Sequence, residues 1–288
     1  MGFSINTNLD ALNTYKNLTN VQSSLSNSLA KLSSGLRINN AGDDAAGLTI
    51  ATQLGSQVSG LTQASRNAQD GVSVVQTADG ALTQAQALLG RLRDLAVQAG
   101  NDSNSTDART AISTEATSIT DELDRLGTSV NFNGKALLDG SASNLTFQVG
   151  ANSGADNQIT VDLSGANLTG AKGVAAGAAA GGIAGTLEAN DYSTATAAMT
   201  SLGKIDTAIK AVSTARASIG ALENRFSSAV STIQTSITNL TAAKSRITDV
   251  DMASEMVNYS RANILSQSGT AMLAQANSMP QLALKLLG

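Results

Sequence analysis

The chain has 288 residues, which is enough for one or two domains with a sizeable core. It contains no His and no Cys, which excludes imidazole bases, thiol nucleophiles, disulfides and zinc sites built from those ligands. The net charge of −4 makes nucleic acid an unlikely partner, and the combination of 2% aromatic residues, one Pro and many Ala residues favours long helices.

Helical periodicity begins close to the N-terminus. Leu18, Leu25 and Leu32 are spaced by seven residues, which places them on one face of a helix. Gly35 follows shortly afterwards and is typical of the residue that ends a helix. We therefore predict a first helix that ends near Gly35, followed by a loop at about 37–47.

A second and longer helix is predicted over about 48–99. Its apolar residues recur at heptad spacing: Leu54, Leu61, Ala68, Val75, Leu82, Leu89 and Ala96. Gly100 ends this series, and a new one follows after a short turn, at Ile112, Ile119 and Leu126. Two helices joined by a short turn pack antiparallel, so we expect a helical pair here.

The period changes in the middle of the chain. Asn133-Gly134 is a strong signal for a two-residue hairpin turn. Farther on, apolar residues alternate with polar ones around Phe147 and again around Val161, as they do in β-strands. We predict β-hairpins at about 131–165 and a Gly/Ala-rich surface stretch at about 165–190.

Helical spacing returns in the last third of the chain. The first series consists of Ile219, Phe226, Ile233, Leu240 and Ile247. A final helix is predicted from about 252, with large apolar residues seven apart at Leu265, Met272, Met279 and Leu286. Small residues stand three positions before each of them and would let a partner helix approach closely: Ala262, Gly269, Ala276 and Ala283.

These patterns predict a mainly α fold. Long terminal helices form a coiled-coil-like bundle, with a small β-hairpin region in the centre of the chain. Because the β region interrupts two helical ends, we expect the ends to pair with each other. One interpretation is a bundle closed within the chain. The other, which the length of the terminal stripes favours, is that neighbouring subunits complete the helices.

Few motifs could carry chemistry. The carboxylates of Asp43-Asp44 have no further ligand beside them in the sequence, so we interpret the pair as an acidic cap at a helix N-terminus. Asp249 and Asp251 imitate the start of a calcium loop but lack its Gly and its final Glu. We expect no catalytic residue, no cofactor and no metal, and we expect that the protein is not an enzyme. We also expect no membrane-spanning segment and no cleavable signal peptide.

Several long motifs resemble those of bacterial flagellin. In the first half they are SINTNLDAL at 4–12, LSSGLRINNAGDDAAGLTIA at 32–51, GRLRDLAVQ at 90–98 and NFNGKALLDG at 131–140. In the second half they are ALENRFSSAVSTIQ at 221–234, NLTAAKSRITDVDMASEM at 239–256 and MLAQANSMPQLALKLL at 272–287. The resemblance covers roughly 1–150 and 200–288, in the family's order.

The resemblance implies a layered architecture. An inner terminal-helix domain would comprise 1–38 and 255–288, with Leu18, Leu25, Leu32, Leu265, Met272, Met279 and Leu286 as its assembly residues. Linkers would lie at 39–47 and 248–254. The outer domain would be 48–247, with its bundle formed by Leu54, Leu61, Val75, Leu82, Leu89, Ile219, Phe226, Ile233, Leu240 and Ile247.

The resemblance also implies a function. The chain would be a structural, self-assembling subunit of the flagellar filament, which is an extracellular tube used for swimming. It would be secreted by the flagellar type III apparatus, bound by an export chaperone on its C-terminal segment, and assembled with the cap and hook-associated proteins. The alternative is a hook–filament junction protein of the same organelle. Nucleic acid and membrane are not implied as partners.

One segment carries a further implication. GRLRDLAVQ resembles the stretch of flagellin that the flagellin-sensing Toll-like receptor contacts. By position in this motif, Arg91 and Leu95 would be receptor contacts, and Glu115 would match an acidic contact on the next helix. Gly90 stands where the family usually has Gln, which removes a contacting side chain and loosens the helix.

Overall fold

A computed structural model describes residues 8–141, 144–169, 187 and 190–287, and the side chains of the last helix as far as Met279. The chain divides into two compact units: Met1–Gln57 with Asn239–Gly288, called the terminal unit below, and Val58–Thr238, called the central unit. The division falls inside two long helices and not in the predicted linkers. Leu286 and most of the predicted Gly/Ala-rich stretch lie outside the residues whose side chains are described.

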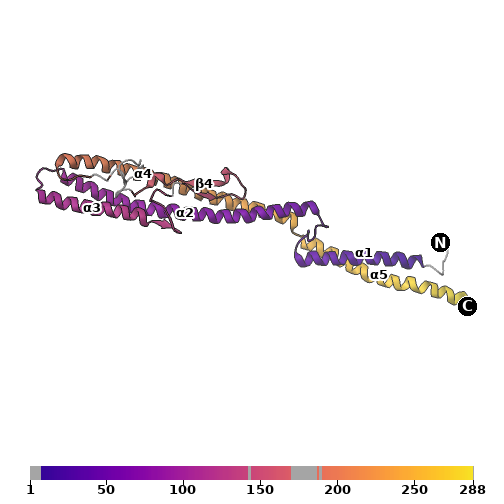
Figure 1. Ribbon diagram of the computed structural model, residues 1–288. Coiled ribbons are helices and arrows are strands. Elements are labelled where there is room, and N and C mark those ends of the chain that lie inside the picture. Colours follow the sequence, from indigo (N-terminus) through magenta and orange to yellow (C-terminus); the bar gives the residue numbers. More distant parts are fainter. Residues whose placement is uncertain (1–7, 142–143, 170–186, 188–189, 288) are drawn as a thin grey trace. The chain divides into compact units, whose positions relative to one another are not determined.

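Five helices account for most of the described chain, which confirms the predicted mainly α class. Their bounds are α1 Leu9–Ser34, α2 Ala45–Ala99, α3 Thr106–Ser129, α4 Ala195–Thr248 and α5 Met252–Leu287 (Figure 1). Gly35 ends α1 in the left-handed conformation, at φ 72°, and its N–H donates to the Lys31 carbonyl. A Gly pays no steric penalty in this conformation, so the predicted helix stop is confirmed.

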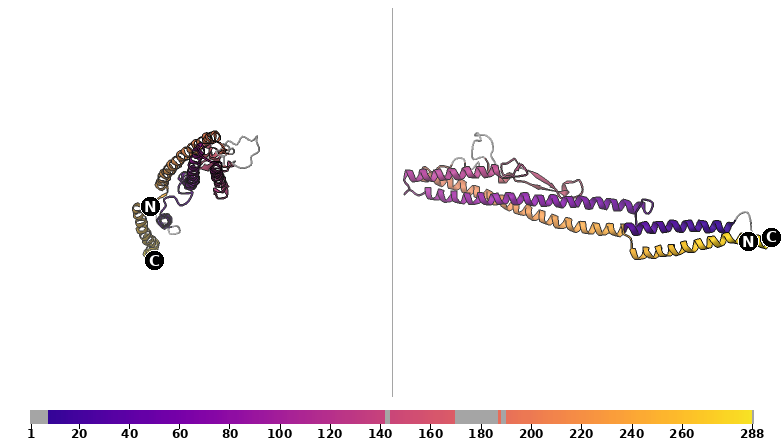
Figure 2. Two further views of the ribbon diagram at one scale, coloured as in Figure 1. Left: turned by 90° about the vertical axis from the view of Figure 1, so that its left-hand side faces the viewer. Right: turned by 90° about the horizontal axis from the view of Figure 1, so that it is seen from below.

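In the terminal unit, α1 lies along α5 (Figure 2, right). The faces that meet repeat every seven residues, with half-buried Leu18, Leu25 and Leu32 on α1. Opposite them α5 presents its small residues: a Cβ added to Gly269 would lie 3.1 Å from the Leu18 Cδ1 atom. The row of small residues predicted from the sequence is therefore the surface of α5 that lets α1 approach closely.

The Asn8 side chain secures the outer end of this pair. Its Oδ1 accepts the Ala11 N–H at 3.0 Å and so caps α1. Its Nδ2 donates to the Ala276 carbonyl of α5 at 2.7 Å. One amide therefore begins one helix and attaches it to the other.

The central unit contains the hydrophobic core. Its heptad residues Val75, Leu82 and Leu89 are fully buried on α2, and Ile219 and Phe226 are buried on α4, as predicted. Ile233 is also buried, whereas Leu54, Leu61, Leu240 and Ile247 are only half-buried in the single chain. Leu54, Leu240 and Ile247 belong to the terminal unit, so the fully buried heptad residues are concentrated in the central unit.

Two small antiparallel hairpins pack on this core, which confirms the predicted β region. β1 Asn131–Phe132 pairs with β2 Lys135–Ala136 across Asn133 and Gly134, both of which have positive φ, as a two-residue hairpin turn requires. β3 Leu145–Gln148 pairs with β4 Gln158–Val161, with Phe147 opposite Ile159. The Phe147 ring meets the Phe226 ring edge to face, at a centroid distance of 5.5 Å.

The close contact of Phe226 with α2 predicts opposite effects for two glycine substitutions. A Cβ at Gly71 would lie 2.6 Å from the Phe226 ring, so Gly71→Ala should overpack the core and destabilise the unit by about 1–3 kcal/mol. A Cβ at Gly80 would meet open space, so Gly80→Ala should stabilise α2 by about 0.5–1 kcal/mol. Urea unfolding of the unpolymerised variants measures both changes. Equal shifts of the midpoint for both variants would contradict this account of the packing.

Candidate functional site

The terminal unit exposes an unusual amount of apolar surface. On α5, Met272 is 62% exposed, and Leu265 and Met279 are also exposed. The predicted inner-assembly residues therefore fall into two groups in the single chain. Leu18, Leu25 and Leu32 face the α1–α5 seam, whereas the three residues of α5 are exposed to solvent. Further large exposed side chains lie on both helices: Leu9, Leu12, Tyr15, Leu29, Met252, Met256, Val257 and Ile264.

The apolar residues of α5 surround the helix instead of forming one stripe. Ala262 is buried on the side of α1, while Ile264, two residues further along the helix and so on the opposite side, is 64% exposed. A shallow groove of about 460 Å³ runs along this outer side, lined by Met256, Val257, Ser260, Arg261, Ile264 and Leu265. A helix that is apolar all round is normally buried. This outer side of α5, with Leu265, Met272 and Met279, is called the outer α5 face below.

Within the terminal unit, residues 35–37, which stand just before the predicted linker 39–47, lie beside the start of the predicted linker 248–254. The Arg37 N–H donates to the Thr248 carbonyl at 2.6 Å, and the Val250 N–H donates to the Gly35 carbonyl at 3.1 Å. The Arg37 guanidinium adds a bond to the Ile247 carbonyl at 2.7 Å. Arg37 uses two carbonyls left free at the end of α4, and Val250 uses the Gly35 carbonyl that follows α1, so the segment after α1 is tied to the segment between α4 and α5.

Carboxylates order the turns around these connections. The Asp43 carboxylate accepts the N–H groups of Asn40 at 2.9 Å and Asn39 at 3.0 Å, and these two bonds lower its pKa below the ordinary 3.8. The Asp44 carboxylate accepts the Gly47 N–H at 2.8 Å and caps α2, so the cap predicted for the pair is confirmed for Asp44; for Asp43 it is wrong, because that carboxylate is bound by the turn before the helix. Asp251 caps α5 in the same way through Ala253.

The residues matched to receptor contacts lie in the central unit. Arg91 on α2 and Glu115 on α3 form an exposed ion pair, with Nη2 and Oε1 2.6 Å apart. Leu95, in contrast, is 2% exposed, because it continues the buried face of α2 beside Leu92 and Ala96. The expectation that Leu95 is a surface contact is therefore wrong for the packed unit; only Arg91 and Glu115 are accessible.

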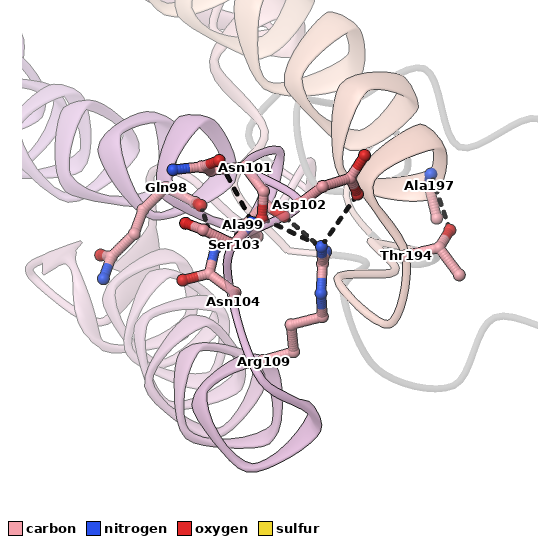
Figure 3. A network of polar contacts seen from close by, with 9 residues as sticks. All are labelled: Gln98, Ala99, Asn101, Asp102, Ser103, Asn104, Arg109, Thr194 and Ala197. Carbon is pink, nitrogen blue, oxygen red and sulfur yellow. Dashed lines mark hydrogen bonds and ion pairs between the residues drawn. The ribbon is translucent and has the colours of Figure 1, made fainter.

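One buried charged side chain, Arg109, carries no recognisable signal in the sequence. Arg109 on α3 is 9% exposed, and its guanidinium donates to the Ala99 carbonyl at 2.5 Å and the Asn101 carbonyl at 3.0 Å (Figure 3). Its Nη2 atom also lies 3.4 Å from the Asp102 carboxylate. Arg109 thus closes the C-terminal end of α2 and fixes the turn into α3. Nothing in the spacing of this Arg distinguishes it from an exposed helix residue.

Within the described ranges, no group of three or more Asp, Glu, His or Cys residues is placed to hold a metal ion. No helix in the described part of the chain is both long enough and apolar enough to span a membrane. The chemistry that these residues offer is therefore apolar burial, helix pairing and exposed ion pairs.

The bonds to Asp43 predict a local acid transition. Because the folded pKa is lowered, the stabilisation that this carboxylate provides is complete above its ordinary pKa of 3.8 and is lost as the pH falls through the lower folded value. The amide resonances of Asn39 and Asn40 should follow this loss in an NMR titration, and Asp43→Asn should abolish the pH dependence.

Asp162→Asn is the matched control, because Asp162 also has a lowered pKa, from hydrogen bonds to Ser164, but lies in the central unit. It should leave the resonances of Asn39 and Asn40 unchanged. A titration of these two amides that persists in Asp43→Asn would assign the transition to another group.

Comparison with known proteins agrees with these features. The bacterial flagellin N-terminal helical region matches residues 5–143, and the C-terminal helical region matches residues 202–287. The chain is 43% identical to a flagellin of Bacillus subtilis strain 168, over 98% of this chain and 99% of that protein. It is 39% identical to the flagellar filament 33 kDa core protein of Treponema phagedenis, over the same shares of the two chains.

A crystal structure of Bacillus cereus flagellin is also similar, with 27% identity and a TM-score of 0.48 over 62% of this chain and 94% of that one. The two family regions together span most of the sequence, and the relatives align over nearly their whole length. The chain belongs to the bacterial flagellin family.

Proposed function

We propose that this flagellin is the structural subunit of a flagellar filament and that it polymerises through the outer α5 face. The observation that carries the proposal is the exposure of large apolar side chains on the side of α5 that α1 does not cover. Each such side chain gains about 1.5–3 kcal/mol when it is fully removed from water. A second copy of the chain can supply that cover, because every copy carries the same helices.

The proposal keeps the layers implied by the family resemblance. Segments 1–38 and 255–288 form the inner layer, and 48–247 form the outer layer. The connections at 39–47 and 248–254 join them, and the second is hydrogen-bonded to Gly35 and Arg37, just before the first. The half-buried residues Leu54 and Leu240 would be covered by neighbouring subunits, which is why the core of one chain does not extend to them.

The same proposal accounts for the remaining expectations. A chain without Cys needs no disulfide chemistry after export, which suits a secreted, extracellular filament protein. Its partners would be further copies, the cap and hook-associated proteins, and an export chaperone on the C-terminal segment. The work of such a protein is polymerisation and torque transmission, and we propose no catalysis.

A charged substitution tests the outer α5 face. Met272→Asp should prevent seeded polymerisation, because a carboxylate buried without a partner in a dry interface costs several kcal/mol. The central unit has its own core, so its thermal unfolding should be unchanged. Sedimentation of seeded samples and circular dichroism of the monomer measure the two effects.

Two further variants make this test specific. Met272→Leu keeps the apolar volume and should polymerise like the unchanged chain. Leu25→Asp on the α1–α5 seam should also prevent polymerisation, since it separates the helices that present the face. Normal filaments from Met272→Asp would overturn the proposed interface. Failure of the unchanged chain to elongate filament seeds would instead favour the hook–filament junction alternative.

A second function is proposed for the unpolymerised chain: recognition by the flagellin-sensing Toll-like receptor through Arg91 and Glu115. The supporting observation is that this ion pair joins α2 to α3 on an exposed surface of the central unit. A guanidinium beside a carboxylate presents directional hydrogen-bonding groups of both signs, as interface hot spots often do.

Receptor activation by monomer should fall about tenfold in Arg91→Ala, the effect of losing about 1.4 kcal/mol at one hot-spot residue. Arg93→Ala is the matched control, because Arg93 lies on the same helix and also forms an exposed ion pair, with Asp206 at 2.8 Å. A reporter-cell assay measures both variants. Equal losses of receptor activation in Arg91→Ala and Arg93→Ala would mean that the positive charge of α2, and not the Arg91–Glu115 pair, controls recognition.

A further inference from the structure

All the sulfur in this chain is thioether sulfur. The sequence has six Met and no Cys, and it also lacks Trp, so Met is the side chain that mild oxidants attack first. Four of the six stand on one helix, α5: Met252, Met256, Met272 and Met279. We call these four the α5 thioethers.

The α5 thioethers are accessible in the single chain. Their exposed fractions range from 45% to 62%, although Met is usually a core residue. None of them belongs to the hydrophobic core of the central unit, and α1 packs against the small residues of α5 instead. Met256 lines the apolar groove on the outer side of the helix. Oxidant can therefore reach these sulfur atoms without unfolding the chain.

We propose that the α5 thioethers are a reversible oxidation site through which peroxides control whether the chain can polymerise. The proposal rests on the proposed function, because it requires that the exposed surface of α5 becomes buried between copies. The co-reactant is a hydroperoxide, and hydrogen peroxide is the probe.

The chemical step is an oxygen transfer. A lone pair on the methionine sulfur attacks one oxygen of the peroxide; the S–O bond forms as the O–O bond breaks. The departing hydroxide takes the proton of the transferred oxygen and leaves as water. The sulfur loses two electrons and becomes a sulfoxide, and the peroxide gains them. Methionine sulfoxide reductases, one for each sulfoxide epimer, return the thioether with electrons from a thiol.

The product is incompatible with a dry interface. A sulfoxide replaces a flexible apolar thioether with a polar group that needs a hydrogen-bond donor. In the groove that Met256 lines, Val257, Ile264 and Leu265 offer none, and the donors there are confined to Ser260 and Arg261. The oxidised chain should keep its fold, because these side chains are exposed and lie outside the hydrophobic core, and it should lose only the ability to join a filament.

The experiment compares monomer and filament of the unchanged chain under hydrogen peroxide. Peptide mass spectrometry should find sulfoxide on the α5 thioethers several-fold faster in monomer than in preformed filament. Peroxide-treated monomer should keep its circular dichroism spectrum and lose seeded elongation. Treatment with both reductases and a thiol should restore elongation.

Two variants assign the effect to these residues. The fourfold Met→Leu variant at 252, 256, 272 and 279 is compared with its own untreated sample, and peroxide should leave its elongation rate unchanged, whatever that rate is. Met199→Leu removes an exposed thioether of the central unit and should remain as sensitive as the unchanged chain. Normal elongation by oxidised monomer, or a loss that the reductases do not reverse, would overturn the proposal and leave the proposed function intact. If untreated monomer does not elongate seeds, the proposed function fails and this proposal fails with it.

Discussion

The close approach of α1 to α5 through small side chains is the interaction on which the rest of the terminal unit depends. Since Gly269 leaves room for Leu18, the two helices meet without placing a large residue of α5 between them. The large residues of α5 are therefore left on the outside, where a single chain cannot bury them. The same packing produces a close helix pair and an exposed apolar outer surface on α5.

The central unit, in contrast, buries its large apolar side chains within the single chain. It buries its leucines, valines and isoleucines against two long helices and two short hairpins, and the single Phe147–Phe226 contact is its largest aromatic feature. With aromatic residues at 2% of the sequence, repetition of aliphatic side chains at heptad spacing replaces the few large anchors that other cores use.

Much of the fold could be predicted because it depends on local rules. Heptad spacing identifies every long helix, Gly35 marks a helix end, and Asn133-Gly134 marks a hairpin. The spacing could not decide which of the two apolar faces of α5 packs against α1. Leu265 and Met272 have the same period as Gly269 but lie on the exposed side, and Leu95 has the chemistry of a contact residue but is buried. The role of Arg109 depends on a turn that brings carbonyl groups to it, and no sequence pattern encodes that geometry.

The seam of small residues has a consequence for alignment along the helix axes. Large side chains enter this seam from α1 alone, at Leu18, Leu25 and Leu32, while α5 contributes small ones. The position of one helix along the other is set at the two ends of the pair, by Asn8 on the Ala276 carbonyl and by the backbone bonds of Gly35 and Arg37. The α1–α5 pair thus has a fixed length between the hydrogen bonds at its two ends. Side-chain substitutions between the two ends preserve that length. Insertion or deletion of one residue in α1 alone would shift one end along the helix, so the hydrogen bonds at both ends could not form together.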